Sequence, residues 1–313
     1  MEKTVLIVDV ESGSVGCALA RIIPGEAPKL FAESRVALPI FNTLSSATLV
    51  GEIEKTAREM ITHASLVAAR LRGHESVAQM GIVSSALVFC SPPWTSLTTN
   101  NQGLGWEHEP AVASAIRDAI KDVFGDVPVS FHAFGTAAMH ASNTLFQNQN
   151  EFLLCTVGGE LAELLLVDGG HLAGHATLPI GQHTVLRTLQ HHAGISAQEA
   201  RSALRLRGHN AFAEPLEATA THLEKEFGGA VDEMLGEHFV HGILVIAPEP
   251  LGEWFARALS QAQSLAEIFP HGTAVQALHT RHLAPYLAAH AALPDLLLML
   301  EALFANKKFN TVY

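Results

Sequence analysis

The hydrophobic residues near the N-terminus fall into three short runs separated by turn residues. These runs are Val5–Val10, Val15–Ile23 and Leu30–Ile40, and Glu11-Ser12-Gly13-Ser14 divides the first from the second. Short apolar runs bounded by turn residues are typical of strands. From Ser46 to Arg72 the apolar positions recur with a period near that of an amphipathic helix. The pattern therefore predicts three consecutive strands followed by a long helix.

The same pattern returns in the second half of the chain. Three further apolar runs, Phe152–Val157, Leu164–Val167 and His171–Ile180, are separated by glycine-containing turns. The first two runs match the N-terminal ones at an offset of 147 positions (157 minus 10), and the third matches at 140 (178 minus 38) because the second turn is shorter. A repeat this long is typical of duplicated domains and not of a solenoid. The sequence therefore predicts one strand-strand-strand-helix unit used twice.

Strands and helices alternate along the rest of the chain. Between the two units we expect a strand over Val77–Phe89, a polar loop over Thr98–Glu109, a helix over Ala111–Phe124, a strand over Val127–His132 and a helix over Gly135–Asn143. After the second unit we expect helices near Val185–His192, Ser196–Leu206 and Leu216–Leu235, a strand over Gly242–Ala247 and a mostly helical C-terminus. This alternation predicts an α/β fold.

Composition narrows the class of protein. A length of 313 residues allows two domains of roughly 150 residues each. With 48% hydrophobic residues the chain is too apolar to be disordered, and it has no uncharged apolar run of the roughly 18 residues needed to span a membrane. The net charge of −12 removes the electrostatic attraction that nucleic-acid binding requires. We therefore expect a folded protein with no nucleic acid partner.

The cysteines and the N-terminus indicate the compartment. Cys17, Cys90 and Cys155 lie far apart in apolar runs, so we expect small core residues and neither a disulfide framework nor a metal knuckle. Met1–Thr4 leads directly into the first strand, which is unlike a secretory signal. We expect a cytoplasmic protein.

Three loops after predicted strands are candidate ligand sites, because α/β proteins bind ligands there and glycine lets a phosphate approach the backbone. Their candidate residues are Asp9, Glu11, Ser12, Gly13 and Ser14 in the first loop, Gly158, Gly159 and Glu160 in the second, and Ala247, Pro248 and Glu249 in the third. Since the first two loops come from equivalent units, we expect them to face each other across a cleft.

The order of elements resembles the actin and sugar-kinase superfold, and within it the FtsA-like proteins of cell division and the PilM-like proteins of type IV pilus assembly. The stretches Leu178–Thr184 and Gly194–Ala200 carry the closest similarity. They resemble a family segment in which a Pro-x-Gly-Gly turn opens one helix and Ser-x-x-Glu-Ala begins the next. The resemblance implies a first domain of residues 1–148, completed by the C-terminal helix 285–313, and a second domain of residues 149–284.

The resemblance also implies that two phosphate hairpins and a late adenosine loop enclose ATP and magnesium, and here the hairpins depart from the family pattern. In the first hairpin Asp9 and the two serines remain, but Glu11 stands where a glycine is usual, and Gly16 where a lysine or another polar residue is usual. Asp9 could still hold a magnesium ion.

The second and third loops depart further. In the second, Thr156 replaces an aspartate, and Glu160 and Leu161 replace a glycine and a threonine. In the third, Ala247-Pro248-Glu249 replaces three glycines, and the proline ring blocks a close backbone approach.

We expect these changes to impair nucleotide binding. Each added carboxylate repels a triphosphate by about 1 kcal/mol at 4 Å in water, and by more in a cleft of lower dielectric. With Asp9 alone retained, hydrolysis lacks its second carboxylate, and we identify no catalytic residue. The chain is thus expected to have no firm cofactor. Weak binding of ATP with magnesium, bridged by Glu11 or Glu160, is the alternative.

Other sites receive less support. Residues Glu11–Gly16 are one residue short of a GxGxxG dinucleotide motif, and they do not open a helix. No serine lies in a G-x-S-x-G elbow. Among the 18 histidines the candidate metal-binding pairs are His171 and His175, His191 and His192, His238 and His241, and His279 and His282. No Cys or carboxylate joins any of these pairs in a metal-ligand pattern, so locally bonded or solvated histidines are favoured.

The C-terminal stretch Leu293–Phe309 is strongly apolar and ends near Lys307 and Lys308. It is similar in character to the amphipathic membrane anchor of FtsA-like proteins. However, Leu296–Leu300 leaves no polar face, and a helix that is apolar all round is usually buried. We therefore expect this helix to pack in the fold, and we expect the chain not to bind membranes by itself.

The sequence thus favours an actin-like scaffold of the PilM or FtsA kind with a degenerate nucleotide site. Its expected role is to support assembly of a membrane-bound pilus or division complex. The expected partner is a cytoplasmic segment of an inner-membrane protein, which would bring the chain to the membrane, and self-association is a further interaction to consider. The alternative is an active ATPase or small-molecule kinase of the same superfold that uses Asp9 and one other acidic residue.

Overall fold

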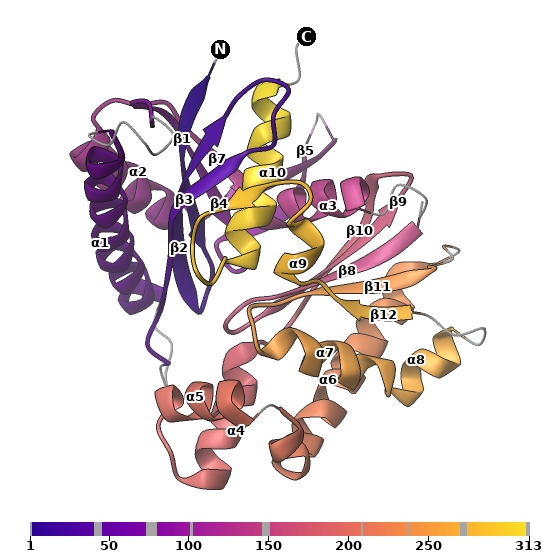
Figure 1. Ribbon diagram of the computed structural model, residues 1–313. Helices are drawn as coiled ribbons and strands as arrows, with labels where there is room; N and C mark the ends of the chain where they lie inside the picture. The colour runs from indigo at the N-terminus through magenta and orange to yellow at the C-terminus, as the bar shows by residue number, and fades with distance from the viewer. Residues whose placement is uncertain are drawn as a thin grey trace. The chain divides into compact units, whose positions relative to one another are not determined.

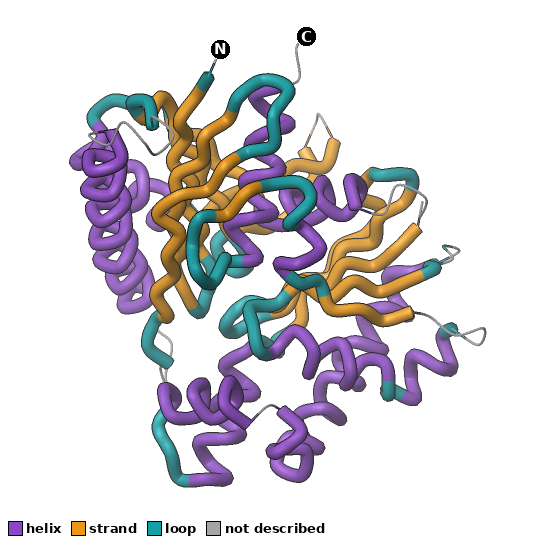
Figure 2. Tube along the Cα trace, viewed as in Figure 1, coloured by secondary structure: helices purple, strands orange, loops and turns teal. Residues whose placement is uncertain are grey.

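The computed structural model describes residues 2–40, 46–72, 80–100, 103–145, 151–207, 209–236, 238, 240–269 and 274–310. The chain divides into two compact units. The first unit comprises Met1–Ala141 with His279–Tyr313, and the second comprises Ser142–Leu278. Each unit is built on one main sheet with helices packed against it (Figures 1 and 2).

The first unit contains a mixed six-stranded sheet in the order β13-β3-β2-β1-β4-β7. Its strands are β1 (Lys3–Val10), β2 (Ser14–Ile22), β3 (Lys29–Ala37), β4 (Val83–Cys90), β7 (Val129–Ala133) and β13 (Ala288–Ala289). Strand β1 pairs antiparallel with β2 and parallel with β4. The strands predicted near the N-terminus are therefore confirmed. Residues 77–79 of the predicted strand Val77–Phe89 lie outside the described part of the chain.

The prediction of a polar loop over Thr98–Glu109 is wrong. Strands β5 (Thr95–Asn100) and β6 (Gly103–His108) form a separate antiparallel hairpin there. Thr95, Thr98 and Thr99 supply the β-branched side chains that favour a strand. The hairpin is separate from the two main sheets, so its strands do not need continuous apolar side chains. Their polar composition therefore suggested a loop.

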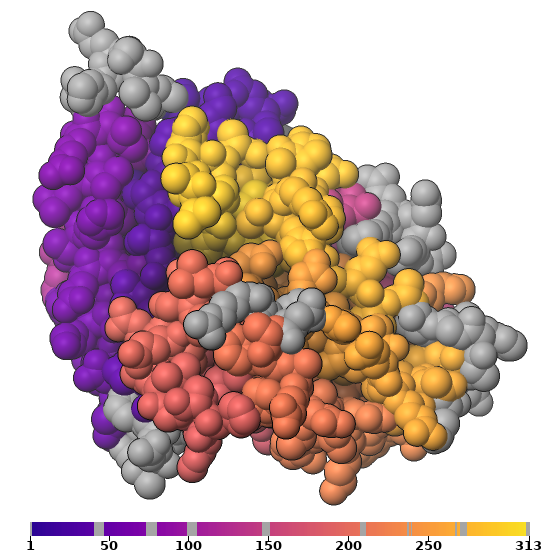
Figure 3. All heavy atoms as spheres, turned by 60° about the horizontal axis from the view of Figure 1, so that its bottom comes forward, coloured from indigo at the N-terminus to yellow at the C-terminus, as the bar shows by residue number. Residues whose placement is uncertain are grey.

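Helices cover both faces of the first sheet. Figure 1 shows α1 (Ser46–Arg72) and α2 (Pro110–Phe124) on one side and α10 (Leu296–Asn310) on the other. Side chains of β1, β2 and β4 form one core with α1 and α2. The outer face of α1 contributes to the surface in Figure 3. Two further helices, α3 (Phe134–Leu145) and α9 (Thr280–Leu283), complete the set.

Helix α10 is buried, as expected for Leu293–Phe309. Every residue from Leu296 to Leu303 is buried, and the helix packs against β1, β2, β3 and α9. Its apolar surface is thus already covered by its own unit. Within the part of the chain that the structure describes, no helix has both the length and the hydropathy to cross a membrane.

The second unit has a five-stranded sheet in the order β10-β9-β8-β11-β12. Its strands are β8 (Glu151–Val157), β9 (Ala162–Asp168), β10 (His171–Leu178), β11 (Gly242–Ile246) and β12 (Ala274–Ala277). Its helices are α4 (Gln182–Ala193), α5 (Ala197–Arg207), α6 (Ala213–Leu235), α7 (Leu251–Ser260) and α8 (Gln263–Ile268), with a 3₁₀ turn η1 (His209–Phe212). Ser196 and Glu199 form the predicted capping box of α5, with reciprocal bonds of 2.8 and 3.2 Å.

The sheet order confirms the predicted duplication. In each unit the third strand pairs with the second, the second with the first, and the first with the fourth. The registers also correspond, because Val10 lies opposite Val15 and Val157 lies opposite Ala162. The chain is therefore a duplicated α/β protein, and each copy has one tight turn between its first two strands.

Candidate functional site

The first turn is a closed hairpin whose polar side chains point inward. The Glu11 N–H donates to the Ser14 carbonyl at 3.1 Å, and the Leu38 N–H donates to the Gly13 carbonyl at 2.8 Å. Asp9, Glu11, Ser12 and Ser14 are all buried. Buried polar groups require partners, so the surroundings of these side chains determine what the hairpin can bind.

The principal partner is Arg35 on β3, a residue that the sequence analysis did not select. Its Nη2 lies 2.7 Å from Asp9 Oδ2, and its Nη1 donates to Ser14 Oγ at 2.8 Å and lies 3.9 Å from Glu11 Oε1. The Ser14 hydroxyl in turn donates to Glu11. The guanidinium thus occupies the space inside the hairpin and neutralises charge that would otherwise be buried alone.

Gly16 makes room for this guanidinium. A Cβ atom at Gly16 would lie 2.7 Å from Arg35 Nη2 and 3.0 Å from its Cζ. Real side chains essentially never make contacts this short, so any larger residue at position 16 would displace the arginine. The position at which the resembling family usually carries a polar side chain is therefore taken by an arginine from the neighbouring strand.

Asp295 fixes the other side of Arg35. Its Oδ2 accepts a bond from Arg35 Nε at 2.6 Å, and its Oδ1 accepts one from Nη2 at 3.1 Å. Oδ1 also accepts the backbone N–H groups of Leu297 and Leu298 at 3.0 and 3.1 Å, so Asp295 caps the N-terminus of α10. These bonds and Arg35 outweigh the effect of burial and hold the pKa of Asp295 below its usual value.

Glu301 lies beneath this cluster, fully buried in α10. Burial, followed by the nearby charge of Asp9, raises its pKa well above the ordinary value. Burial likewise raises the pKa of Asp9, and it raises that of Glu11 to about 7.

The second turn, between β8 and β9, is closed in a similar way. Arg187 of α4 donates two hydrogen bonds to Glu160, from Nη1 to Oε2 at 2.8 Å and from Nη2 to Oε1 at 2.6 Å. His183 Nδ1 lies 2.9 Å from Glu160 Oε1, and its Nε2 lies 3.3 Å from Arg201. Since arginine can only donate, Nε2 accepts and the ring proton is on Nδ1. Partial burial acts to raise the pKa of Glu160, but the bonds from His183 and Arg187 lower it to about 2.

The glycines of this turn bind the start of α4. The Gly158 and Gly159 carbonyls accept the N–H groups of Gln182 and His183 at 2.9 and 2.7 Å. Helix N-terminal N–H groups are ordinary donors for anions, and here the turn has already used two of them. A Cβ on Gly181 would lie 2.4 Å from the Gly159 oxygen, so the turn and the helix are in direct backbone contact.

Comparisons with known proteins now bear on the fold. No protein-family model matches the chain, and no curated protein matches it significantly. Among solved structures, the PilM–PilN type IV pilus biogenesis complex gives a TM-score of 0.60 at 12% identity, over 96% of each chain. The ethanolamine utilization protein EutJ from Carboxydothermus hydrogenoformans gives 0.57 at 12% identity, over 98% of this chain and 89% of that one. MreB 5 of Spiroplasma citri bound to AMPPNP gives 0.50 at 9% identity, over 99% and 96%.

The chain has the actin-like fold. The predicted fold class and the resemblance to the actin-like group, PilM among them, are therefore confirmed. At these identities the similarity shows the fold alone. The role of this chain has to be argued from its own side chains.

The third predicted loop of the actin-like chain follows β11. Ala247 is buried, Pro248 is half-buried and Glu249 is exposed, and the Leu251 N–H donates to the Pro248 carbonyl at 3.1 Å as α7 begins. This loop lies in the second unit with Gly158, Gly159 and Glu160, whereas Asp9 to Ser14 lie in the first. The assignment of all three loops to one nucleotide site stays a prediction.

The cysteines are free thiols in the core, and several histidines lie near other side chains. All three cysteines are buried and free, as predicted. His175 Nε2 lies 3.0 Å from Glu163 Oε1, and the His279 and His282 rings are 5.4 Å apart. A concavity of about 550 Å³ lies beside α4, and its lining residues are Thr184, Arg187, Thr188, His191, His192 and Pro215.

The sequence analysis missed the partners of the two hairpin glutamates. Arg35, Asp295 and Arg187 are distant in sequence from the turns that they contact in the fold. Two signals were nevertheless present in the sequence. Asp295 directly precedes an apolar helical run, as an N-cap residue does, and Glu301 is an isolated charge within that run.

Proposed function

We propose that this protein is an actin-like scaffold whose nucleotide site is closed by its own side chains, and that it supports assembly of a membrane-bound pilus or division complex. The observation that carries the proposal is Arg35, which binds Asp9, Ser14 and Asp295 inside the first hairpin. A magnesium–phosphate group at this hairpin would have to displace the arginine and leave at least two buried carboxylates to rearrange. Such a rearrangement is costly because unpaired buried charges are strongly unfavourable.

The second hairpin supports the same proposal. Glu160 is held by a bidentate arginine, and the first N–H groups of α4 bond to the turn. Two backbone donors at the start of α4 are therefore already bonded to the turn, and a phosphate at either hairpin would meet a glutamate paired with an arginine. The glutamates that depart from the family pattern are thus parts of two internal ion-pair clusters.

The rival proposal is an active ATPase or small-molecule kinase. The fold alone does not separate the two, because the similar MreB 5 structure is bound to AMPPNP. The enzyme would need Asp9 to hold magnesium and a second carboxylate to act on the nucleophile. In this chain Asp9 is paired with Arg35, which favours the scaffold.

The proposed partner is a cytoplasmic segment of an inner-membrane pilus or division protein. The structure of PilM in complex with PilN supports this choice, since it pairs a protein of this fold with a pilus component. The burial of α10 supports membrane association through the partner and not through this helix. Facing hairpins across a cleft between domains 1–148 and 149–284, and self-association of the chain, remain part of the proposal.

A phosphate-release assay on the full chain with ATP and Mg²⁺ tests the choice between scaffold and enzyme. We expect release no faster than in buffer, both for the parent chain and for Asp9→Asn. If the parent releases phosphate and Asp9→Asn does not, the enzyme is the correct interpretation. The assay should include a preparation of Arg21→Ala as a control for arginine substitutions, since Arg21 pairs with Glu2 at the end of β2 away from the hairpin.

A further inference from the structure

A third cluster of polar side chains lies at the far end of the sheet in the second unit. Glu151 begins β8 and Asp168 ends β9, and the two residues are directly opposite each other in the antiparallel register. Residues in this relation project on the same face, where two like charges destabilise the pairing. They are separated from the Gly158 turn by the length of β8, roughly 20 Å. This cluster is therefore distinct from both hairpin clusters.

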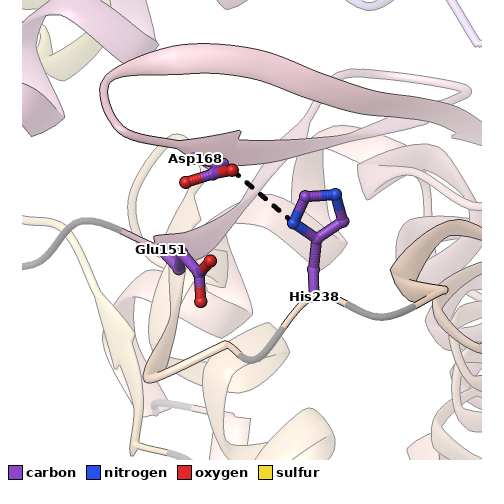
Figure 4. A group of neighbouring side chains, drawn as sticks. All are labelled: Glu151, Asp168 and His238. Carbon is purple, nitrogen blue, oxygen red and sulfur yellow. Dashed lines mark ion pairs between the residues drawn. The ribbon is translucent and has the colours of Figure 1, made fainter.

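His238 completes the cluster from the connection between α6 and β11. Its Nδ1 lies 3.7 Å from Asp168 Oδ2, and one ligand atom from each of the three residues lies within 4.8 Å of the others. Figure 4 shows the two carboxylates and the imidazole gathered around one space. The backbone holds this arrangement, because the His238 N–H donates to the Leu235 carbonyl at 2.8 Å and the His241 N–H donates to the Glu151 carbonyl at 3.2 Å.

The charge of the cluster is not balanced by the protein. Among the described residues, neither Glu151 nor Asp168 forms an ion pair with a lysine or arginine, and the contact with His238 is the one ion pair between them and a basic group. The three side chains are only partly buried, so they can rotate and water can reach them. A bound cation would remove the repulsion between the two carboxylates and use the imidazole as a neutral ligand.

We propose that Glu151, Asp168 and His238 bind a divalent transition-metal ion of the Zn²⁺ class. One imidazole nitrogen with two carboxylate oxygens is a donor set that such ions accept, whereas Mg²⁺ and Ca²⁺ prefer oxygen ligands alone. Bonds of about 2.1 Å in a tetrahedral arrangement separate ligand atoms by about 3.4 Å. The ligand atoms therefore need to approach one another by at most about 1.4 Å, which is 4.8 minus 3.4 Å. The fourth position stays open for water.

The ion would link the connection between α6 and β11 to the ends of β8 and β9. Its ligands are far apart in sequence, at positions 151, 168 and 238. This explains why spacing did not reveal them. The sequence suggested His241 as the partner of His238, but in the structure the potential metal ligands beside His238 are carboxylates from two strands.

Titration calorimetry with Zn²⁺ on the full chain tests the proposal. We expect one site in the parent chain and an affinity at least tenfold weaker in each of Glu151→Gln, Asp168→Asn and His238→Ala. The three residues lie at the ends of strands or in a connection and are partly exposed, so the variants should fold. The control His63→Ala removes an exposed histidine from α1 in the other unit and should leave the affinity unchanged.

Co²⁺ provides an independent spectroscopic measurement. Visible absorption of Co²⁺ bound to the parent chain should report nitrogen and oxygen coordination, and His238→Ala should abolish that spectrum. Mg²⁺ should not compete with Zn²⁺. If the parent chain binds no Zn²⁺, or if all three variants bind it as tightly as the parent, the proposal is wrong and any binding belongs to the other histidines.

Discussion

At the scale of single residues, Arg35 balances the charges of the first hairpin. It is the cation that faces Asp9, Glu11 and Asp295. Replacing it with alanine removes the cation beside these buried carboxylates, and such losses cost about 3–5 kcal/mol. We expect Arg35→Ala to lower the free energy of unfolding by that amount in urea denaturation at pH 7.

The matched control for Arg35 is Arg21→Ala on the neighbouring strand β2. The Arg21 and Arg35 side chains are 15% and 14% exposed, but the partner of Arg21, Glu2, is 40% exposed, and an ion pair whose carboxylate reaches water contributes about 1 kcal/mol or less. Equal effects of the two substitutions would contradict the role that we assign to Arg35. An Arg35→Lys variant should recover only part of the loss, because an ammonium cannot form the forked contacts.

Glu11 makes stability depend on pH. Its pKa is about 7 in the folded chain and 4.5 ordinarily, so between these values the folded state keeps a proton that the unfolded state releases. Stability should therefore fall as pH rises from 4.5 to 7, by up to about 1.4 kcal/mol per pH unit from this group. Glu301 and Asp9, whose pKa values are also raised, act in the same direction, whereas the lowered pKa of Asp295 affects stability only below its ordinary value of 3.8, outside this range.

Glu11→Gln isolates this contribution, because an amide keeps the size of the side chain but does not titrate. Urea denaturation of the parent and the variant from pH 4.5 to 8 should give a shallower decline for the variant. Parallel curves for the two proteins would show that Glu11 does not hold a proton in this range. They would also remove the argument that burial sets its charge.

At the scale of elements, α10 is a core helix and not a surface anchor. Leu298 is fully buried, whereas Leu293, just before the helix, is 88% exposed. Leu298→Ala should cost about 2–5 kcal/mol, and Leu293→Ala should change stability by less than about 0.5 kcal/mol. If the two leucines gave similar small losses in denaturation experiments, α10 would not be packed as described.

The contact between the second turn and α4 is also an element-scale feature. Gly181→Ala places a Cβ 2.7 Å from the Gly158 oxygen and even closer to that of Gly159, so the turn and helix must separate. We expect a loss of about 1–3 kcal/mol. The control Gly51→Ala, in α1 with nothing within 4 Å, should instead stabilise the chain by roughly 0.5–1 kcal/mol. Thermal unfolding that orders the two variants the other way would contradict this packing.

At the scale of the whole molecule, the sequence predicted the fold better than the site. Apolar runs such as Val5–Val10 and their repeat at Phe152–Val157 predict strands because burial of a central strand requires continuous apolar side chains. The β5–β6 hairpin was missed because it carries no such run.

The site was only half predictable for a related physical reason. The turn residues Glu11 and Glu160 stand out locally, but their ion-pair partners Arg35 and Arg187 lie on neighbouring elements. Only the folded chain shows whether an added carboxylate faces a ligand or a side chain of the same protein. The sequence therefore predicted repulsion of phosphate, whereas in the structure Glu11 and Glu160 each lie beside an arginine.

Titration calorimetry of ATP with Mg²⁺ into the full parent chain tests the central claim most directly, because a closed site and a functional one differ in affinity. We predict binding no tighter than high micromolar. The double variant Glu11→Gly with Glu160→Gly should bind more tightly, since it removes two carboxylates and opens both turns. Low-micromolar binding by the parent chain that is lost in Asp9→Asn would contradict the account. Asp9 would then bind the nucleotide's metal ion instead of pairing with Arg35.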